Sequence, residues 1–231
     1  MLIWLVALGL AVGSFLGALT WRLPRGQKIT AGRSVCPHCR HKITWYHNIP
    51  VFSYLVLQGK CSYCKKKISV RYPLIEIGTA LVFMALGWRF GLSLDLVFYL
   101  IVASVALAVL VIDFEHQIIP DSLVFVGLAV GLTRFSYAFV LAGFLAATFL
   151  LLTNLVTRGR GMGLGDVKLA LFLGTVLGPK LTVVWLMISF ITGALVGLAL
   201  IIFGKTSFGK KIAFGPFLVI GFFVTVLVGS V

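Results

Sequence analysis

The chain has 231 residues, of which 60% are hydrophobic and only 11% are charged, and its mean hydropathy is +1.10. A soluble domain of this length could not bury so much apolar surface, so the composition excludes an ordinary soluble protein and predicts a membrane protein. The formal net charge of +14 raises nucleic-acid binding as an alternative, which the distribution of the charges decides.

Apolar stretches recur along the whole chain. A transmembrane helix needs roughly 20 mostly apolar residues, and eight stretches approach that description. We therefore predict an all-α polytopic membrane protein with about eight transmembrane helices and a small cytoplasmic insert that binds zinc. Its three parts would be a first transmembrane helix at 1–21, the insert at 22–73 and a transmembrane core at 74–231. The predicted spans are 2–21, 74–88, 94–112, 121–136, 138–156, 167–179, 181–203 and 212–230.

The first predicted span carries its positive charges after its apolar run, whereas a cleaved signal peptide carries them before it. A retained helix with its N-terminus outside is therefore expected.

Seventeen of the 20 lysines and arginines fall on one side of the predicted spans, in 22–73, 157–168 and 204–211. The positive-inside rule places these segments in the cytoplasm. Because topology accounts for the charge, we expect no nucleic-acid partner.

The polar segment 22–73 contains all four cysteines, as two Cys-x-x-Cys pairs. Two such pairs can complete a tetrahedral zinc site, and four sulfur ligands leave no position for water, so the metal is expected to be structural. In a reducing compartment disulfides are disfavoured, although two disulfides, a redox-active pair or unrelated thiols remain alternatives. The predicted ligands are Cys36, Cys39, Cys61 and Cys64.

Three lysines at 65–67 follow the second cysteine pair. They predict a solvated, inward-facing charge cluster that also attracts the anionic headgroups of membrane lipid. A contact surface for a substrate is the alternative.

The chain has only six acidic residues, and an ionisable side chain at membrane depth suggests a function by default. Three of the six have ordinary explanations. Asp95 is expected at the outer membrane interface, and Asp121 is expected to cap the N-terminus of the helix that follows it. Glu115 and its neighbour His116 belong to a short loop and are expected to be solvated.

Asp113 ends the third predicted span and Asp166 begins the sixth, both on the cytoplasmic side. The two aspartates therefore share one membrane depth. If their helices touch, two carboxylates a few ångströms apart cannot both ionise at low cost, and one keeps a proton. Aspartic hydrolysis requires such a pair: the ionised carboxylate takes a proton from water while the protonated one hydrogen-bonds the scissile carbonyl.

Glycines precede the second aspartate in "GRGMGLGD". Gly163 and Gly165 would allow an extended peptide to lie against the backbone with its bond beside Asp166. The alternative is that Asp166 only caps a helix after a flexible loop. Lys168 is expected to anchor the helix end at the interface.

Five stretches resemble the type IV prepilin peptidase family and occur in the order expected for it, with the tetracysteine insert between the first and the second. Gly17 departs from the pattern, because family members often have asparagine there. The stretches are "GSFLGALTWRLPRG" (13–26), "ISVRYPLIE" (68–76), "IDFEHQIIPD" (112–121), "GLGDVKL" (163–169) and "FGPFL" (214–218).

The resemblance implies a GxGD-type aspartyl protease of the bacterial inner membrane with Asp113 and Asp166 as its catalytic pair, facing the cytoplasm. Its substrates would be prepilins or pseudopilins with a short basic leader. Many members also methylate the new N-terminus with S-adenosylmethionine, and Glu76 is a candidate contributor; a buried carboxylate paired with Arg71 or Arg22 is the alternative. A non-enzymatic ion or proton pathway with a zinc docking module is the rival function.

Overall fold

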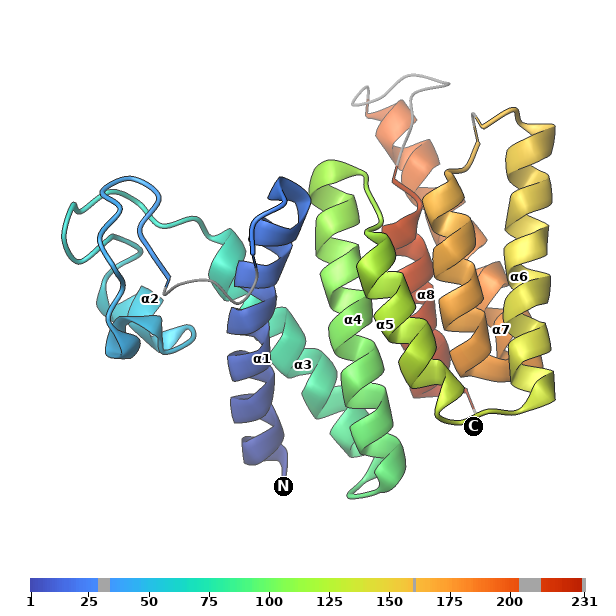
Figure 1. Cartoon of the computed structure of the whole chain (residues 1–231), viewed down its shortest axis with the longest axis horizontal. Coiled ribbons are helices and arrows are strands. Elements are labelled where there is room, and N and C mark those ends of the chain that lie inside the picture. The colour runs from blue at the N-terminus through green and yellow to red at the C-terminus, as the bar shows by residue number, and fades with distance from the viewer. Residues whose placement is uncertain (29–33, 160, 204–212, 230–231) are drawn as a thin grey trace. The chain divides into compact units, whose positions relative to one another are not determined.

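The computed structural model describes residues 1–28, 34–159, 161–203 and 213–229 (Figure 1). It is 75% helical, and the described residues form no strand, which confirms the predicted all-α class. Within these described ranges, five helices are long and apolar enough to cross a membrane. The contacts divide the chain into two compact units, Met1–Ser104 and Val105–Val231, so the boundary falls inside the helix α4 (Leu94–His116).

The N-terminal unit, Met1–Ser104, contains a pair of long helices and the polar insert between them. The insert holds a few short helical turns and two isolated β-bridges. The helical elements before α4 are α1 (Leu2–Arg22), η1 (Leu23–Arg25), η2 (Trp45–Asn48), α2 (Phe52–Val56) and α3 (Arg71–Phe90).

Small residues let α1 and α3 approach closely. Gly9, Gly13 and Gly17 are spaced four residues apart on α1, so they share one face of the helix. A Cβ atom at Gly13 would lie 2.6 Å from the Cα of Glu76, and one at Gly17 would lie 3.2 Å from the ring of Tyr72. Glycine at position 17 therefore leaves room for that ring, which gives the departure from the family pattern a structural reason.

The C-terminal unit, Val105–Val231, is a bundle of apolar helices with the end of α4 at its start. Helix α7 packs against α5, α6 and α8, and Figure 1 shows these helices side by side. Beyond α4, the described helices are α5 (Asp121–Leu132), α6 (Tyr137–Val156), α7 (Leu164–Ile202) and α8 (Gly215–Val228).

Helix α7 has 39 residues and breaks at Gly178, whose φ of 73° and ψ of 177° are not helical, just before Pro179. A straight helix of this length would measure about 58 Å, almost twice the roughly 30 Å of a bilayer core. The two spans predicted here are therefore two halves of one element, joined without a loop. Counted with these halves, the described chain has the eight apolar segments that were predicted.

The two halves of α7 pack against different neighbours. Gly174 in the first half lies so close to α6 that its Cβ would be 2.9 Å from the Cα of Gly143. In the second half the indole N–H of Trp185, which is completely buried, donates a 2.7 Å hydrogen bond to the carbonyl of Leu218 in α8. The basic segment 204–211 between α7 and α8 lies outside the described residues.

Candidate active site and metal centre

Four helix ends meet at one end of the C-terminal unit: the C-terminus of α4 and the N-termini of α5, α7 and α8. Ile119, just before α5, shows the convergence. A Cβ atom at Gly165 in α7 would lie 3.1 Å from the Cβ of Ile119, and one at Gly215 in α8 would lie 3.3 Å from its Cδ1. Both candidate catalytic aspartates belong to these helix ends.

Asp113 lies in the last turn of α4 and is only 4% exposed. The backbone N–H of Gly215, at the start of α8, is a hydrogen-bond donor to its carboxylate. Its second oxygen, Oδ2, is buried and has no hydrogen-bond partner among the described residues. A buried carboxylate oxygen without a partner is costly, and such atoms in native proteins call for an explanation such as catalysis.

Asp166 lies in the first turn of α7 and is 7% exposed. Its Oδ2 accepts a 2.9 Å hydrogen bond from the backbone N–H of Gly163, the residue that caps the helix. Asp166 also lies near enough to Asp113 for the two carboxyl groups to interact electrostatically. The capping alternative and the paired-carboxylate hypothesis are therefore compatible, because one aspartate makes both interactions.

The two glycines of the site differ in their surroundings. Helix α7 begins at Leu164, so Gly163 is its N-cap and Gly165, which was expected in a loop, lies in the first helical turn. Gly163 has a φ of −86°, which any residue can adopt. Space explains the second glycine, because the side chain of Ile119 lies directly against Gly165.

Asp121 is not the helix cap that was predicted. It is the first residue of α5, makes no capping hydrogen bond, and accepts a 2.7 Å hydrogen bond from the ammonium of Lys168 in α7. Lys168 thus has a specific partner, and the interfacial anchoring expected for it stays a prediction. Both side chains are about half exposed, so the pair joins the starts of two helices at the surface.

The loop expected after residue 112 begins later, because α4 continues to His116. Glu115 and His116 therefore lie in its last turn and are partly buried, with 4.0 Å between a Glu115 oxygen and the His116 Nε2 atom. That nitrogen is buried and has no hydrogen-bond partner among the described residues. The expected loop is therefore a helical turn, but the His116 and Glu115 side chains remain 29% and 27% exposed, so solvent still reaches both.

The four cysteines of the insert converge. All are free thiols, and their sulfur atoms lie within 4.8 Å of one another, close enough to hold one metal ion. The sulfurs of Cys36 and Cys64, from different pairs, are 3.9 Å apart, and corners of a tetrahedron with 2.3 Å zinc–sulfur bonds are about 3.8 Å apart. The structure therefore does not contain the two disulfides that were one alternative.

The two Cys-x-x-Cys pairs have the same local fold. The N–H of Cys36 donates to the carbonyl of His41 at 3.0 Å, and the N–H of Cys61 donates to that of Lys66 at 2.9 Å. Burial favours the neutral form of the Cys36 thiol, but hydrogen bonds from the backbone of Cys39 and His38 outweigh burial and lower its pKa to about 7. The pKa of Cys39 moves the other way: a backbone hydrogen bond from His41 lowers it, but burial and hydrogen bonds with the other three thiols raise it to about 11.

Glu76 lies in the N-terminal unit, on α3, and is 7% exposed. Its Oε2 accepts a 2.8 Å hydrogen bond from the N–H of Val51, and its carboxylate also accepts one from the hydroxyl of Ser14. Arg71, one of the partners suggested for it, donates to the carbonyl of Gly17 and the hydroxyl of Thr20. Glu76 also lines an open cavity of about 1490 Å³ between the insert, α1 and α3.

Sequence reasoning missed two backbone donors, the N–H groups of Val51 and Gly215 that bind Glu76 and Asp113. The sequence contains a weak signal for the second, because "FGPFL" was recognised as a motif. The sequence contains no signal for Val51. The structure shows that its φ is 59°, which is strained for a β-branched residue. Such strain often accompanies a functional or anchoring position.

Comparison with known proteins identifies similar sequences along most of the chain. The family described as "Bacterial Peptidase A24 N-terminal domain" matches residues 7–90, and the "Type IV leader peptidase family" matches residues 100–198. Three relatives have the name "Prepilin leader peptidase/N-methyltransferase". Those of Pseudomonas putida, Bacillus subtilis and Pseudomonas aeruginosa are 37%, 34% and 33% identical over 96%, 96% and 97% of this chain and 89%, 92% and 89% of their own. No solved structure matches.

Proposed function

This chain belongs to the type IV leader peptidase family, and from that premise we propose that it is a membrane-embedded aspartic endopeptidase that removes the short basic leader from type IV prepilins or pseudopilins. The observation that supports this most directly is the buried Oδ2 of Asp113, which has no partner among the described residues, in a carboxylate beside Asp166. The rival ion or proton pathway is not favoured, since the relatives are named as peptidases.

The two aspartates would divide the chemistry between them. One carboxylate, ionised, takes a proton from a water molecule, whose oxygen attacks the scissile carbonyl carbon. The other carboxyl, protonated, donates a hydrogen bond to the carbonyl oxygen and stabilises the charge that develops there. The first carboxyl, now protonated, gives its proton to the leaving amine. Hydrogen bonds from Gly163 and Gly215 would hold the two groups in place while this occurs.

The site would face the cytoplasm of a bacterial inner membrane. The loops at this end of the unit carry the lysines and arginines that the positive-inside rule places in the cytoplasm. Gly163 and Gly165 would line the path of the substrate beside Asp166. Lys168 and Asp121, which are paired at the surface, would hold the start of α7 against α5.

The insert would hold a structural zinc ion through Cys36, Cys39, Cys61 and Cys64. Four thiolates form a closed tetrahedral site, which stabilises a fold and leaves no open position for a substrate. The convergence of the four sulfurs within 4.8 Å supports this assignment.

We also propose that the protein methylates the new N-terminus of its product, with S-adenosylmethionine supplying the methyl group. Two observations fit that cofactor. The cavity of about 1490 Å³ has room for it, because typical ligand sites measure only 300–1,000 Å³. Glu76 presents a buried carboxylate at the cavity wall. A carboxylate is suited to a positively charged sulfonium. Arg22 and Arg71, which also line the cavity, are suited to the cofactor's own carboxylate.

The peptidase assignment is tested by incubating membranes that contain the protein with a prepilin and comparing variants. Asp113→Asn and Asp166→Asn should each reduce cleavage by on the order of 10³-fold or more, because an amide cannot exchange the proton. Asp95→Asn is the matched control, because Asp95 is exposed near the other end of α4. Normal cleavage by either aspartate variant would show that the residue is not catalytic.

The methylation assignment has a separate test. Glu76→Gln can still accept a hydrogen bond from Val51, but it lacks the charge. We expect this variant to cleave prepilin normally, while transfer of a labelled methyl group to the product falls at least tenfold, about the effect of losing one charged contact. Unchanged methyl transfer would show that Glu76 has a structural role and takes no part in methylation.

A further inference from the structure

The insert exposes large apolar side chains on η2, on α2 and at Ile49 in the short connection between them. Their exposed fractions range from 40% for Ile49 to 81% for Trp45. A soluble segment seldom exposes so many neighbouring apolar groups, and such a surface usually contacts another protein or a membrane. The "apolar insert surface" consists of Trp45, Tyr46, Ile49, Phe52, Leu55 and Val56.

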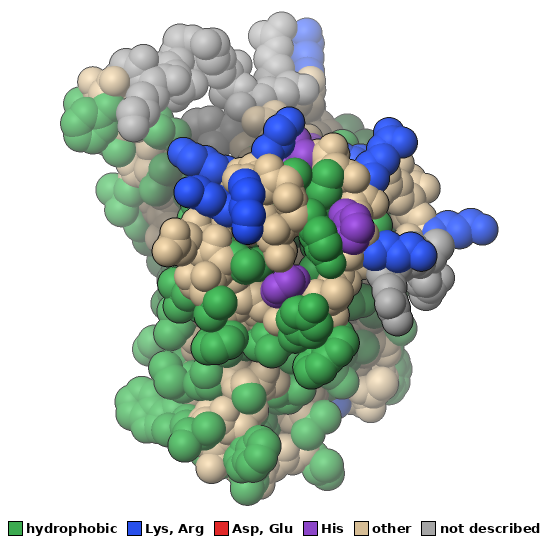
Figure 2. Space-filling model, turned by 90° about the vertical axis from the view of Figure 1, so that its left-hand side faces the viewer, with side chains coloured by type: hydrophobic (Ala, Val, Ile, Leu, Met, Phe, Trp, Pro, Cys, Tyr) green, Lys and Arg blue, Asp and Glu red, His purple; other side chains and the backbone are tan. Residues whose placement is uncertain are grey.

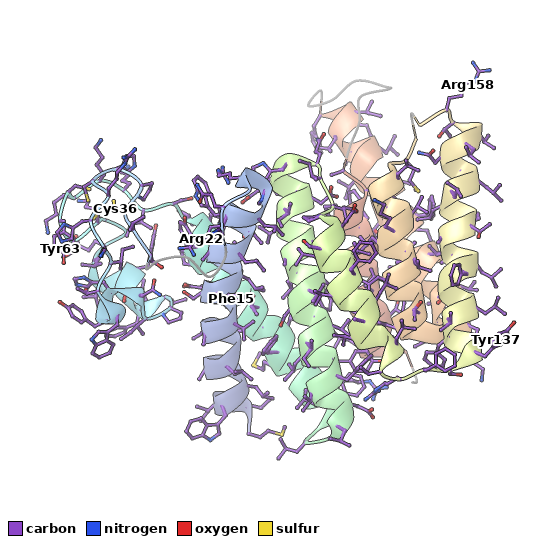
Figure 3. All side chains as sticks on the ribbon, in the orientation of Figure 1. Phe15, Arg22, Cys36, Tyr63, Tyr137 and Arg158 are labelled. Carbon is purple, nitrogen blue, oxygen red and sulfur yellow. The ribbon has the colours of Figure 1, made fainter. Side chains whose placement is uncertain are left out.

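This surface lies beside the transmembrane part of α1. Val51, at the start of α2, donates its N–H to Glu76, and the Cα of Glu76 lies against Gly13. Phe15, on the same helix, precedes the helix end at Arg22 by seven residues, or about 10 Å along the axis. Figure 3 shows α2 at the level of Phe15, deeper than Arg22, although the insert was predicted to be wholly cytoplasmic. The depth agrees with an element that lies in the membrane interface, where apolar faces reach about 5–10 Å below the headgroups.

The backbone of this segment is suited to such a position. Lipid offers no hydrogen bonds, so polar backbone groups at that depth must find partners in the protein. Val51 donates to Glu76, the N–H of Ser53 donates to Ile49 at 3.1 Å, and that of Leu55 donates to Val51 at 3.0 Å. The hydroxyl of Ser53 donates to the carbonyl of Tyr46 at 2.8 Å. The strained conformation of Val51 is therefore held by a buried carboxylate that satisfies its N–H.

Positive charge lies on the other part of the insert. Lys60 and the lysines at 65–67 are exposed around the second cysteine pair. Figure 2 shows Lys and Arg side chains spread over the upper part of the view, with hydrophobic side chains among them and covering the part below. Apolar groups beside cations are complementary to the inner leaflet, where acyl chains lie below anionic headgroups.

We propose that the apolar insert surface is embedded in the inner leaflet at the boundary between headgroups and acyl chains, with the lysines at 65–67 on anionic headgroups. The metal-binding insert is then a peripheral membrane element, and the bilayer is its partner. This inference does not depend on the peptidase assignment, because it rests on exposure, depth, backbone pairing and charge within the N-terminal unit.

The experiment uses the full-length protein in nanodiscs with phospholipids brominated on the upper acyl chain. The emission of Trp45 is obtained as the difference between the wild type and Trp45→Phe. We expect brominated lipid to quench this component at least about twofold and aqueous iodide to quench it little. Trp4→Phe provides the comparison for a tryptophan that is 79% exposed on a transmembrane helix.

Each other result would overturn the proposal. Quenching by iodide with no effect of brominated lipid would place the surface in water. Protection of Trp45 from iodide only after prepilin is added would make it a peptide-binding surface. Metal content and circular dichroism of Trp45→Phe, measured in parallel, show that the variant is folded.

The charge component has its own variant. Replacement of Lys65, Lys66 and Lys67 by glutamine should remove at least half of the increase in Trp45 quenching that phosphatidylglycerol causes in the wild type. Lys180→Gln, an exposed lysine between the two halves of α7, is the control and should change nothing. An unchanged response to phosphatidylglycerol in the triple variant would contradict the role of the lysines.

Discussion

The insert of the N-terminal unit and the helix bundle of the C-terminal unit hold their polar groups by different means. In the bundle, Asp113 and Asp166 lie among completely buried side chains such as Leu169 and Leu218. In the described part of the insert, residues 34–70, only Cys36, Ser53, Gly59 and Cys61 are buried. Packing therefore positions the aspartates, whereas the described part of the insert buries few side chains, which is why we propose that a metal ion stabilises its fold.

Metal removal should separate the two regions most clearly. Cys36→Ser removes one ligand, and because structural zinc contributes about 10–16 kcal/mol to small domains, we expect the insert to unfold. Limited proteolysis should then cut within 34–70 while α5 to α8 stay protected, and metal analysis should find less than the one ion expected per chain. His38→Ala is the control. Full metal content in Cys36→Ser would contradict the four-cysteine site.

A smaller change should break the bundle's arrangement of the aspartates. A methyl group at Gly215 would collide with the Asp113 Oδ2 atom, so Gly215→Ala should displace that carboxylate and lower kcat for prepilin cleavage by about 100-fold. Thermal unfolding measures whether the bundle itself persists. Gly78→Ala is the matched control, because nothing lies within 4 Å of the added atom. Wild-type cleavage in Gly215→Ala would show that the carboxylate has room to move.

Close packing in the N-terminal unit can be tested in the same way. In Gly13→Ala the new Cβ would lie 2.6 Å from the Cα of Glu76, a backbone atom that cannot rotate away. We expect a loss of about 1–3 kcal/mol in the stability of the α1–α3 pair, measured by denaturant unfolding in detergent. Gly78→Ala again serves as the control, and equal stability of the two variants would mean that the helices separate without cost.

The smallest effect is expected at the surface of the bundle. Lys168→Ala removes the ion pair with Asp121. The side chains of both residues are about half exposed. Exposed pairs contribute about 0–1 kcal/mol, so unfolding should change by no more than that and prepilin cleavage should stay within about twofold. A large loss of cleavage, without a loss of stability, would instead place Lys168 in the catalytic machinery.

Local pattern predicted the helical class and which candidate residues lie near one another; their roles stay predictions. Apolar runs placed the helices, charge asymmetry placed Asp113 and Asp166 at one end, and spacing paired the cysteines. Each of these signals lies within a short stretch of sequence or follows from the positive-inside rule.

Individual hydrogen bonds between distant residues could not be predicted. Val51 binds Glu76 across 25 positions, and Lys168 binds Asp121 across 47. Such pairs depend on how helices pack, which hydropathy does not encode. For the same reason Asp121 was expected to cap its helix: local propensity favours a cap, but packing brings Lys168 within reach. The helical end of α4 was missed because Glu115 and His116 are polar.

The break at Gly178 has a practical consequence for topology mapping. Reporter enzymes and protease sites are usually inserted into the hydrophilic turns that connect spans. Here the two halves of α7 are joined directly at Gly178 and Pro179, without such a turn. An epitope placed there would disrupt the helix ends themselves and would report misfolding instead of sidedness. The turn at Gly91, between α3 and α4, has a φ of 60° and open space around it, so it is the better place for a tag.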